Sequence, residues 1–316
     1  MASEAPLFNR DPDGPVLTAA DWPYPVNAVF NPGATVHDGS TVLLVRVEDR
    51  RGISHLTVAR SADGRSDWRI DDKPLLAAEP DNPANCWGVE DPRLTYVDEL
   101  KAYVIAYTSY GPGGPAVSLA LTADFRTVED LGVILPPEDK NASLLPRRVD
   151  GQFLLLHRPV SVTNDRADVW LSRSTDLRSW SAPEPVMRAR TGPWWDAVRI
   201  GIGPTPIETE KGWLAVYHGV KASANAQIYR AGLCLLDLEK PTKVIRRLPD
   251  WILSPQTPYE LAGDVPNVVF PTGMTHDPAS DELRVYYGAA DTSIGLAVGR
   301  LSRVLEHLWA SEGDVA

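Results

Sequence analysis

Cysteine is scarce in this chain, which has only Cys86 and Cys234 among 316 residues. Two thiols cannot supply the ligand set of a structural zinc site, and no His/Cys pair or Asp cluster has the spacing of metal ligands. Both cysteines stand among apolar neighbours, so we expect buried free thiols rather than a disulfide. The sequence therefore predicts neither a disulfide-stabilised fold nor a metal cofactor.

Basic runs and long apolar runs are also missing. The chain has 31 Lys and Arg against 42 Asp and Glu, a net charge of −11. This balance disfavours a nucleic-acid or anionic-membrane partner, and no apolar run is long enough to span a bilayer. Residues 1–15 have neither the cationic nor the apolar region of a secretory signal, so we expect a cytoplasmic protein. Any anionic substrate would have to be held by a local cluster of cations.

Helical periodicity is nearly absent. The pattern of residues 301–308 predicts a short C-terminal helix over about 301–310, and about residues 1–25 form a short N-terminal extension. The rest consists of short β-like runs separated by turn residues, and 28 prolines with 23 glycines fit a turn-rich β protein. The sequence thus predicts an all-β fold.

An approximate repeat runs through the β-rich part. Each unit has an apolar strand, a polar loop, a second strand and, in four units, a Ser/Thr-x-Asp or similar turn at Asp63, Asp124, Asp176 and Asp237. Trp68 and Trp180 follow two of these turns and are expected to pack within the units. The apolar strands that open the units are 41–47, 101–109, 151–159, 212–220 and 282–291.

Five degenerate units, spaced by roughly 50 to 70 residues, predict an all-β five-bladed β-propeller. Two sandwich domains are the alternative, but no linker-like segment divides the chain, so we expect a single domain over 1–316. Innermost blade strands line a central channel, which makes polar residues in or just after the apolar strands candidate site residues. These are Arg46, Asp91, Arg93, His157, Arg158, His218 and Asp291.

The segment 88–93, Gly-Val-Glu-Asp-Pro-Arg, holds the most informative group of polar residues. Pro92 is expected to keep Asp91 extended, which would fix the direction of its carboxylate. Arg93 could then hold that carboxylate, or a neighbouring one, through two hydrogen bonds. The segment can equally be a structural salt bridge that closes a turn between blades.

Further polar segments recur in order along the chain and, together with 88–93, carry a family resemblance. They read NPGA, VEDPR, DKN, LLHRP, WWDAVRIGIGPTPI, GWLAVYHGV, YRAGLCLLDLEKP, PYELAGDVPNVVFPTG and YYGAADTSIGLA. This series resembles glycoside hydrolase family 130, the β-mannoside phosphorylases and related β-mannosidases, which are five-bladed propellers. The resemblance extends from about Asn31 to Ala297.

The resemblance implies inverting cleavage of a β-mannoside, with Asp91 as the general acid. In the family this proton is thought to pass through the 3-hydroxyl of the mannosyl residue. An inverting glycosidase needs a second group that activates water on the opposite face of the sugar. A phosphorylase does not, because phosphate is already a charged nucleophile that cations must position.

The resemblance places phosphate-binding positions on Arg46, Arg199 and His218, with Lys140 and Arg230 as further candidates. Arg199 stands where many members have lysine, so the charge is kept but its geometry differs. The remaining substrate-binding candidates are Asn31, Arg93, Tyr229, Glu260, Asp291 and Trp195. His157 is more consistent with a structural role.

Three functions remain open on this basis. Retained cations favour a phosphorylase that uses inorganic phosphate as co-substrate, needs no cofactor and acts on manno-oligosaccharides. A β-mannosidase is the alternative, with Glu260 or, after it, Asp196 as the water-activating base. Glu260 can equally be a structural cap or an acceptor for a sugar hydroxyl. A carbohydrate-binding propeller without catalysis would require neither an acid nor a phosphate site. Residues 110–115 and 221–227 are expected to shape the acceptor subsites, and the sequence carries no signature of linkage or oligomeric state.

Overall fold

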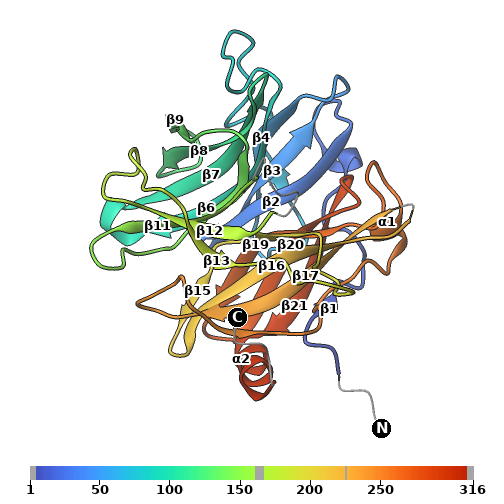
Figure 1. Cartoon of the computed structure of the whole chain (residues 1–316). Coiled ribbons are helices and arrows are strands. Elements are labelled where there is room, and N and C mark those ends of the chain that lie inside the picture. The colour runs from blue at the N-terminus through green and yellow to red at the C-terminus, as the bar shows by residue number, and fades with distance from the viewer. Residues whose placement is uncertain (1–4, 161–166, 225, 312–316) are drawn as a thin grey trace.

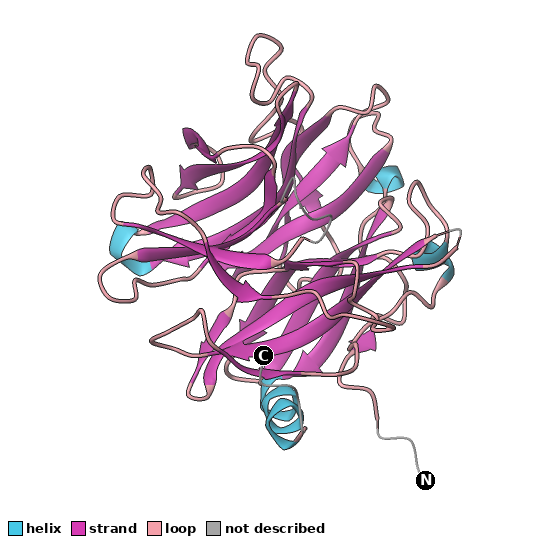
Figure 2. Cartoon of the chain, viewed as in Figure 1, coloured by secondary structure: helices cyan, strands magenta, loops and turns pink. Residues whose placement is uncertain are grey.

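The computed structural model describes residues 5–160, 167–224 and 226–311. It is built almost entirely of strands joined by loops (Figures 1 and 2). Within these residues, helical structure is confined to four short segments: η1 (Ala19–Asp21), η2 (Asp98–Leu100), α1 (Pro258–Leu261) and α2 (Leu301–Ala310). The α2 helix confirms the predicted C-terminal helix. Within the described ranges, no helix is both long and apolar enough to cross a membrane.

The strands pair in chain order into antiparallel groups. The first group comprises β2 (Ala28–His37), β3 (Ser40–Glu48), β4 (Ser54–Ser61) and β5 (Arg69–Ile70). The second comprises β6 (Gly88–Val97), β7 (Ala102–Gly111), β8 (Gly114–Thr122) and β9 (Glu129–Leu135). A parallel bridge between Ser54 and Gly88 joins these two groups into one sheet.

Three further sheets follow. The third group comprises β10 (Asp139–Leu144), β11 (Phe153–Pro159), β12 (Val169–Ser174) and β13 (Glu184–Met187). The fourth comprises β14 (Arg199–Ile202), β15 (Ile207–Thr209), β16 (Gly212–Ala222), β17 (Gln227–Leu236) and β18 (Val244–Arg247). The fifth comprises β19 (Val269–Asp277), β20 (Glu282–Ala289), β21 (Ser293–Arg300) and, from the other end of the chain, β1 (Asn9–Arg10).

Apolar clusters fill the space between successive groups. One cluster joins Leu44 of β3 to Ile105 of β7, and corresponding clusters join the second group to the third, the third to the fourth and the fourth to the fifth. A further cluster packs Tyr286 of the fifth group against Leu43 of the first. Each sheet is therefore buried on both faces, and the last group packs against the first.

The strands that open the five groups differ from those expected. The apolar strands 41–47, 101–109, 151–159, 212–220 and 282–291 correspond to β3, β7, β11, β16 and β20, which are second in the pairing order of their groups. The opening strands are β2, β6, β10, β14 and β19. Prolines and β-bulges interrupt β2, β6 and β19, so these strands lack the alternating pattern that identifies a strand in a sequence.

The repeated aspartates form the turn after the third strand of several groups. Asp176 Oδ1 accepts backbone N–H bonds from Arg178 at 2.9 Å and Ser179 at 2.8 Å, and Asp63 and Asp124 form the same pair of bonds in their turns. Such Asx turns satisfy amide donors that a strand has just released. Trp180 packs against the adjoining apolar cluster, as expected for a residue within the repeat.

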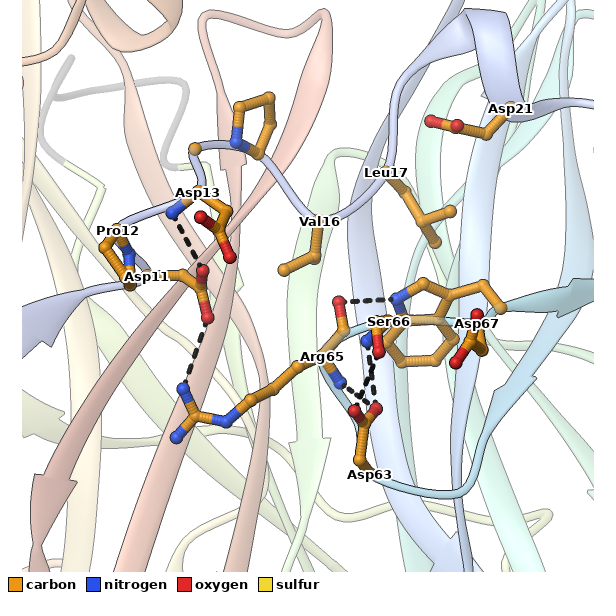
Figure 3. A pocket seen from close by; sticks show the side chains of 13 residues that line it. Asp11, Pro12, Asp13, Val16, Leu17, Asp21, Asp63, Arg65, Ser66 and Asp67 are labelled. Atoms are coloured by element: carbon orange, nitrogen blue, oxygen red, sulfur yellow. Dashed lines mark hydrogen bonds and ion pairs between the residues drawn. The ribbon is translucent and has the colours of Figure 1, made fainter.

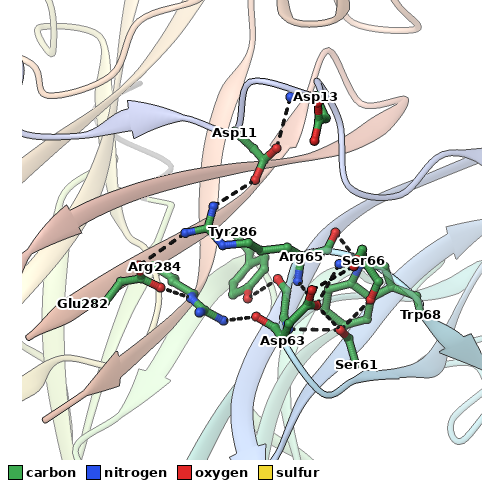
Figure 4. A network of polar contacts seen from close by, with 11 residues as sticks. Asp11, Asp13, Ser61, Asp63, Arg65, Ser66, Trp68, Glu282, Arg284 and Tyr286 are labelled. Carbon is green, nitrogen blue, oxygen red and sulfur yellow. Dashed lines mark hydrogen bonds and ion pairs between the residues drawn. The ribbon is translucent and has the colours of Figure 1, made fainter. Parts of the chain in front are cut away.

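The N-terminal residues are part of the last sheet rather than a free extension. Asn9 and Arg10 pair with β21, and Leu17 forms a bridge with Ile294. Figure 3 shows the following segment running past the Asp63 turn, where it borders a cavity of about 630 Å³. Arg65 in that turn contacts Asp11 at 3.3 Å and Glu282 at 3.2 Å, so the first and fifth groups are joined here (Figure 4).

This N-terminal cavity has no sign of a reactive centre. Asp63, its most engaged carboxylate, accepts hydrogen bonds from Ser61 and from the backbone and side chain of Ser66. Backbone hydrogen bonds from Ser66 and Arg65 hold the pKa of Asp63 below its usual range, which is typical of a turn. A smaller cavity, near the opening strands of the groups, is the stronger candidate for an active site.

The cysteines differ from the expectation in one respect. Both thiols are free, but only Cys234 is buried, whereas Cys86 is half-buried. Cys234 lies in the middle of β17 among apolar side chains, whereas Cys86 lies in the loop before β6.

Candidate active site

A cavity of about 190 Å³ lies where the opening strands of the groups meet. Eight of the residues singled out in the sequence line it: Asn31, Arg46, Asp91, Lys140, Arg158, His218, Tyr229 and Asp291. The structure adds Asn141, Val265, Val268 and Phe270. Asn141 lies in the DKN segment but was not singled out, and Arg158 was a candidate site residue without an assigned ligand.

Three lining residues lie at irregularities of the opening strands. Asn31, Asp91 and Asn141 have φ of 45°, 47° and 55°, and the register of β2, β6 and β10 shifts at each. Asn and Asp tolerate this left-handed conformation better than other non-glycine residues, and a bulge redirects a side chain out of the strand pattern. The expectation that Pro92 keeps Asp91 extended is therefore wrong.

The Asp91 carboxylate is held by two side chains. Asn31 Nδ2 donates to Asp91 Oδ1 at 2.8 Å, and Arg46 Nη1 donates to the same oxygen at 3.0 Å. Burial disfavours the charged form, but Arg46, Arg93 and the Asn31 hydrogen bond outweigh it and lower the pKa of Asp91. In the unliganded site Asp91 is thus a carboxylate.

Arg93 does not hold the carboxylate, contrary to expectation. Its Nη1 donates to the backbone oxygen of Asp91 at 2.7 Å, and its Nε donates to that of Gly203 at 3.2 Å. The side chain is 1% exposed and does not line the cavity, and burial lowers its pKa to about 10. Arg93 therefore fixes the backbone at the bulge and does not reach the substrate cavity.

Arg46 is clamped by the acidic side of the cavity. Besides Asp91 it contacts Glu90 at 3.1 Å, and its Nε donates to Ser54 Oγ at 2.9 Å. Burial opposes its charge, but Glu90 and Asp91 outweigh burial and raise the pKa of Arg46. Because two carboxylates already balance this guanidinium, Arg46 cannot by itself provide the excess positive charge that phosphate requires.

The excess positive charge lies on the other side, around Arg158. Arg158 is buried, its Nη1 lies 3.3 Å from His218 Nε2, and within the described residues it forms no ion pair. Burial and nearby Arg199 lower the pKa of Arg158 to about 10. Lys140 also lines the cavity, and burial together with Arg158 lowers its pKa, although Glu90 and Asp91 act in the opposite direction. Buried cations without counterions are costly, which indicates a site for an anion.

His218 and Arg199 are two further predicted phosphate-binding residues near Arg158. Burial, followed by the charges of Arg158 and Arg93, holds the pKa of His218 well below its usual range, so its imidazole is neutral. Arg199 does not line the cavity itself. Its Nη2 donates to Tyr229 Oη at 2.8 Å and also contacts Gln227.

Several buried polar atoms around the cavity have no hydrogen-bond partner in the described protein. They are Asn31 Oδ1, Asn141 Oδ1, Arg158 Nε and His218 Nδ1. Buried polar groups in native proteins are nearly always paired, and an exception needs an explanation. Their convergence on one cavity, with both donors and acceptors present, indicates a polar ligand such as a sugar with an anion.

Asp291 lies on the acidic side of the cavity. Burial and the neighbouring Asp91, Glu48 and Glu90 raise the pKa of Asp291 to about 7, although Arg46 acts in the opposite direction. Its charged neighbours are thus mainly other carboxylates, and a carboxyl group with a pKa of about 7 can hold a proton near neutral pH.

Asp291→Asn should remove a pH-dependent loss of stability. A carboxyl whose pKa is raised on folding contributes its stability at low pH and loses it as the pH rises through the folded pKa. We expect the wild type to lose more stability than Asp291→Asn between pH 5 and pH 8, as measured by urea denaturation. Parallel changes in both proteins would show that Asp291 does not titrate in this range.

Two of the predicted site residues, Arg230 on β17 and Trp195 beside it, face away from the cavity. Arg230 alternates with the cavity residue Tyr229, so its side chain points to the other face, where Nε donates to Ser254 Oγ at 3.0 Å. Trp195 is 4% exposed and stacks on Tyr217, with ring centroids 5.6 Å apart. The structure thus places the predicted phosphate ligand Arg230 and the predicted sugar platform Trp195 in packing roles.

Glu260, the leading candidate for a water-activating base, is also outside the cavity. Its side chain is fully buried, with Oε1 accepting from Arg10 Nε at 2.7 Å and from Tyr287 Oη at 2.8 Å, and Oε2 accepting from the backbone of Gln256 and Thr257. Arg10 and these hydrogen bonds outweigh burial and lower the pKa of Glu260. It cannot reach a water beside the sugar.

Glu260→Gln should therefore damage stability rather than chemistry. The change leaves the Arg10 guanidinium without its partner, and breaking a buried ion pair costs about 3–5 kcal/mol; because Arg10 is partly exposed, we expect the lower end. Urea denaturation measures this loss. The fraction that remains folded should keep its turnover number. An inactive variant of unchanged stability would instead mean that Glu260 takes part in the reaction.

Asp196 and His157 are likewise structural. Asp196 Oδ2 is bound by Arg190 at 2.8 Å and Arg247 at 2.7 Å and is fully buried. His157 Nδ1 lies 2.6 Å from Asp139 Oδ2 within the third group. Across the described part of the chain, no group of three or more His, Cys, Asp or Glu side chains is arranged to hold a metal ion.

Comparison with known proteins identifies relatives across nearly the whole chain. The family model for glycoside hydrolase family 130, described as beta-1,4-mannooligosaccharide phosphorylase, matches residues 5–309. A 1,2-beta-oligomannan phosphorylase of Thermoanaerobacter sp. (strain X514) is 36% identical over 302 residues, which cover 92% of this chain and 96% of the relative. A beta-1,4-mannooligosaccharide phosphorylase of Ruminococcus albus is 32% identical, covering 89% and 85%.

A solved structure agrees with these matches. The beta-1,2-mannobiose phosphorylase of Listeria innocua, in complex with beta-1,2-mannobiose, superposes with a TM-score of 0.87 at 29% identity, covering 96% of this chain and 99% of that one. The full-length match, the likeness in sequence and the likeness in fold agree, and the chain belongs to glycoside hydrolase family 130.

Proposed function

We propose that this protein is a phosphorylase that cleaves β-mannosides with inversion, using inorganic phosphate and releasing α-mannose 1-phosphate. The observation that carries the proposal is the division of one cavity into an acidic side, at Asp91, and a cationic side, at Lys140 and Arg158. The relatives named above as phosphorylases of β-linked mannosides support the same reaction. The proposed active form is a single catalytic domain over residues 1–316.

The fold supports this arrangement if the five strand groups are the blades of a five-bladed propeller. Each group packs against the next and the fifth packs against the first, with β1 as the outer strand of the fifth blade. The opening strands would then surround the cavity as the innermost strands of the blades. The cytoplasmic location expected from the sequence remains a prediction.

In the proposed reaction, phosphate binds between Lys140, Arg158 and the neutral His218. A phosphate oxygen attacks the anomeric carbon of the mannosyl residue while the bond to the leaving oxygen breaks on the opposite face. The leaving oxygen takes a proton from the sugar 3-hydroxyl, which receives one from Asp91. The β-linkage becomes an α-phosphate, and Asp91 ends as a carboxylate.

Binding of phosphate also favours protonation of the general acid, Asp91. Asp91 is ionised in the empty site because Arg46 and Asn31 stabilise its charge. A dianion bound nearby adds negative charge and raises the pKa of Asp91, so that the proton available in the acidic cluster can move to it. Binding of the nucleophile and protonation of the acid are thereby linked.

Hydrolysis is disfavoured by the position of the carboxylates. A water-activating base must act from the face opposite the general acid. Glu260 and Asp196 are buried in ion pairs, and Asp291 lies among the carboxylates on the acid's own side. Among the described residues, none of the carboxylates that line the cavity stands on the cationic side.

The reverse reaction tests the proposal and reports on the acceptor. We expect the protein to release phosphate from α-mannose 1-phosphate only when an acceptor sugar is present, with mannose, glucose and N-acetylglucosamine tried separately. The product should be a β-linked disaccharide. Release of mannose and phosphate at the same rate without an acceptor would contradict a phosphorylase.

A further inference from the structure

Trp87 and Tyr110 form an exposed aromatic pair to which the reaction assigns no role. Their side chains are 47% and 37% exposed, and their ring centroids lie 5.4 Å apart at an interplanar angle of 68°. Trp87 immediately precedes β6, the strand of Asp91, and Tyr110 lies near the end of its neighbour β7. Exposed aromatic rings offer apolar faces on which a sugar ring can stack.

The pair is held in a fixed place by its backbone. Trp87 N–H donates to Tyr110 O at 3.0 Å, and Gly111 packs so closely on Pro83 that no side chain would fit there. Upstream, buried Asn85 accepts the N–H of Glu79 at 3.1 Å, which fixes the preceding loop. A ring that is already positioned loses little conformational freedom when it binds a ligand.

The strand register places the pair along the acidic side of the cavity. Gly88 pairs with Tyr110, and Glu90 pairs with Thr108. Directly opposed residues of an antiparallel pair project from the same face, so Tyr110 lies on the face of Glu90, about 7 Å farther along the strand. Glu90 contacts Arg46, which lines the cavity.

The chemistry sets the direction in which a longer substrate leaves the cavity. Inversion requires the nucleophile and the leaving oxygen to lie on opposite faces of the mannosyl residue. Phosphate is proposed to bind beside Lys140 and Arg158, so the leaving sugar lies on the side of Asp91. A chain that continues beyond that sugar therefore leaves the cavity on the side of Asp91, which lies on β6.

We propose that Trp87 and Tyr110 form a stacking site for a mannosyl residue on the leaving-group side, beyond the sugar that departs from the cleaved bond. The proposal rests on the function proposed above and deepens it. It makes the protein selective for β-mannosides of three or more units over the disaccharide. Neither ring takes part in the chemical step.

The test compares chain lengths in Trp87→Ala and Tyr110→Ala. In phosphorolysis of β-1,2- and β-1,4-linked mannobiose and mannotetraose, we expect kcat/KM for the tetraose to fall about tenfold in each variant, as expected for the loss of one aromatic stacking contact. The value for the biose should stay within about twofold. Equal falls for both lengths, or no fall for either, would overturn the proposal.

Trp309→Ala is the matched control. Trp309 is also 47% exposed, but it lies on α2, where it packs beneath Arg246 and Lys211. Its removal should leave the ratio of tetraose to biose unchanged. A change of that ratio equal to the one in Trp87→Ala would mean that loss of any exposed tryptophan has this effect, and would overturn the assignment.

A binding measurement separates failure of the stacking site from failure of the proposed function. If the wild type phosphorolyses no β-mannoside, the proposed function fails, and calorimetric titration with mannotetraose decides the stacking site independently. Weaker binding by Trp87→Ala than by Trp309→Ala supports the site. Equal affinities, or no binding by the wild type, overturn it.

Discussion

Asp91→Asn should lower kcat by about 10³-fold, within the range for loss of a general acid. The amide keeps the size of the carboxyl group and tolerates the left-handed backbone at φ 47°, so the bulge in β6 should persist. It can no longer deliver the proton that reaches the leaving oxygen. Initial rates of mannose 1-phosphate release measure the effect.

Binding and a matched variant separate this effect from misfolding. Calorimetry should find mannoside affinity within a few-fold of the wild type, because Asn31 and Arg46 remain beside the amide. Asp150→Asn serves as the control, since Asp150 is exposed and has φ of 51° in a turn far from the cavity. Near-full activity in Asp91→Asn would remove Asp91 from the proton path.

Arg158→Gln should raise the KM for phosphate by about 100-fold, because charge-assisted hydrogen bonds contribute about 1.5–3 kcal/mol. The KM for the mannoside should change far less, because Arg158 belongs to the cationic side of the cavity. Initial rates over a matrix of phosphate and mannoside concentrations separate the two constants. Equal increases in both would contradict a dedicated phosphate site.

The same variant should not lose stability. Among the described residues, buried Arg158 has no ion-pair partner, and its lowered pKa of about 10 indicates that its surroundings disfavour the charge. Removing a charge that the fold disfavours should leave the melting temperature unchanged or higher. Arg173→Gln, on the adjacent strand β12 and paired with Glu184 near the surface, should leave the phosphate KM at the wild-type value. A destabilised Arg158→Gln would indicate a structural arginine instead.

The sequence predicted the second strand of each group but missed the opening one, for a physical reason. Strands such as β3 and β16 carry uninterrupted apolar residues because both faces are buried. The opening strands position Asn31, Asp91 and Asn141 through bulges, and a bulge breaks the pattern from which strands are recognised. The bulges that position the site residues are therefore also the reason why the sequence pattern did not identify their strands.

The predicted site residues that line the cavity came from ordered motifs rather than from single residues. Asp91, Lys140 and His218 were located by the family resemblance, and the structure brings them to one cavity. The sequence left Glu260 open between a base and a structural cap because its partner Arg10 is 250 positions away in the sequence. No local pattern reveals that β1 joins the fifth group and carries Arg10 to this carboxylate.

Side-chain direction explains the other differences. Arg230 and Tyr229 are neighbours in the sequence, but strand alternation sends them to opposite faces of β17. Trp195 was expected to bind a sugar because tryptophan rings suit the apolar faces of sugars, yet it stacks in the core on Tyr217. The direction in which a side chain points depends on the strand register, and the register is set by pairing between strands that are distant in the sequence.

The measurement that tests the central claim most directly is product analysis by NMR on β-1,2- and β-1,4-mannobiose, with and without inorganic phosphate. The division of the cavity into an acid and a phosphate side predicts α-mannose 1-phosphate when phosphate is present and no cleavage without it. Free mannose released at equal rates under both conditions would contradict this account, because water would then be the nucleophile and the cations around Arg158 would lack their proposed role.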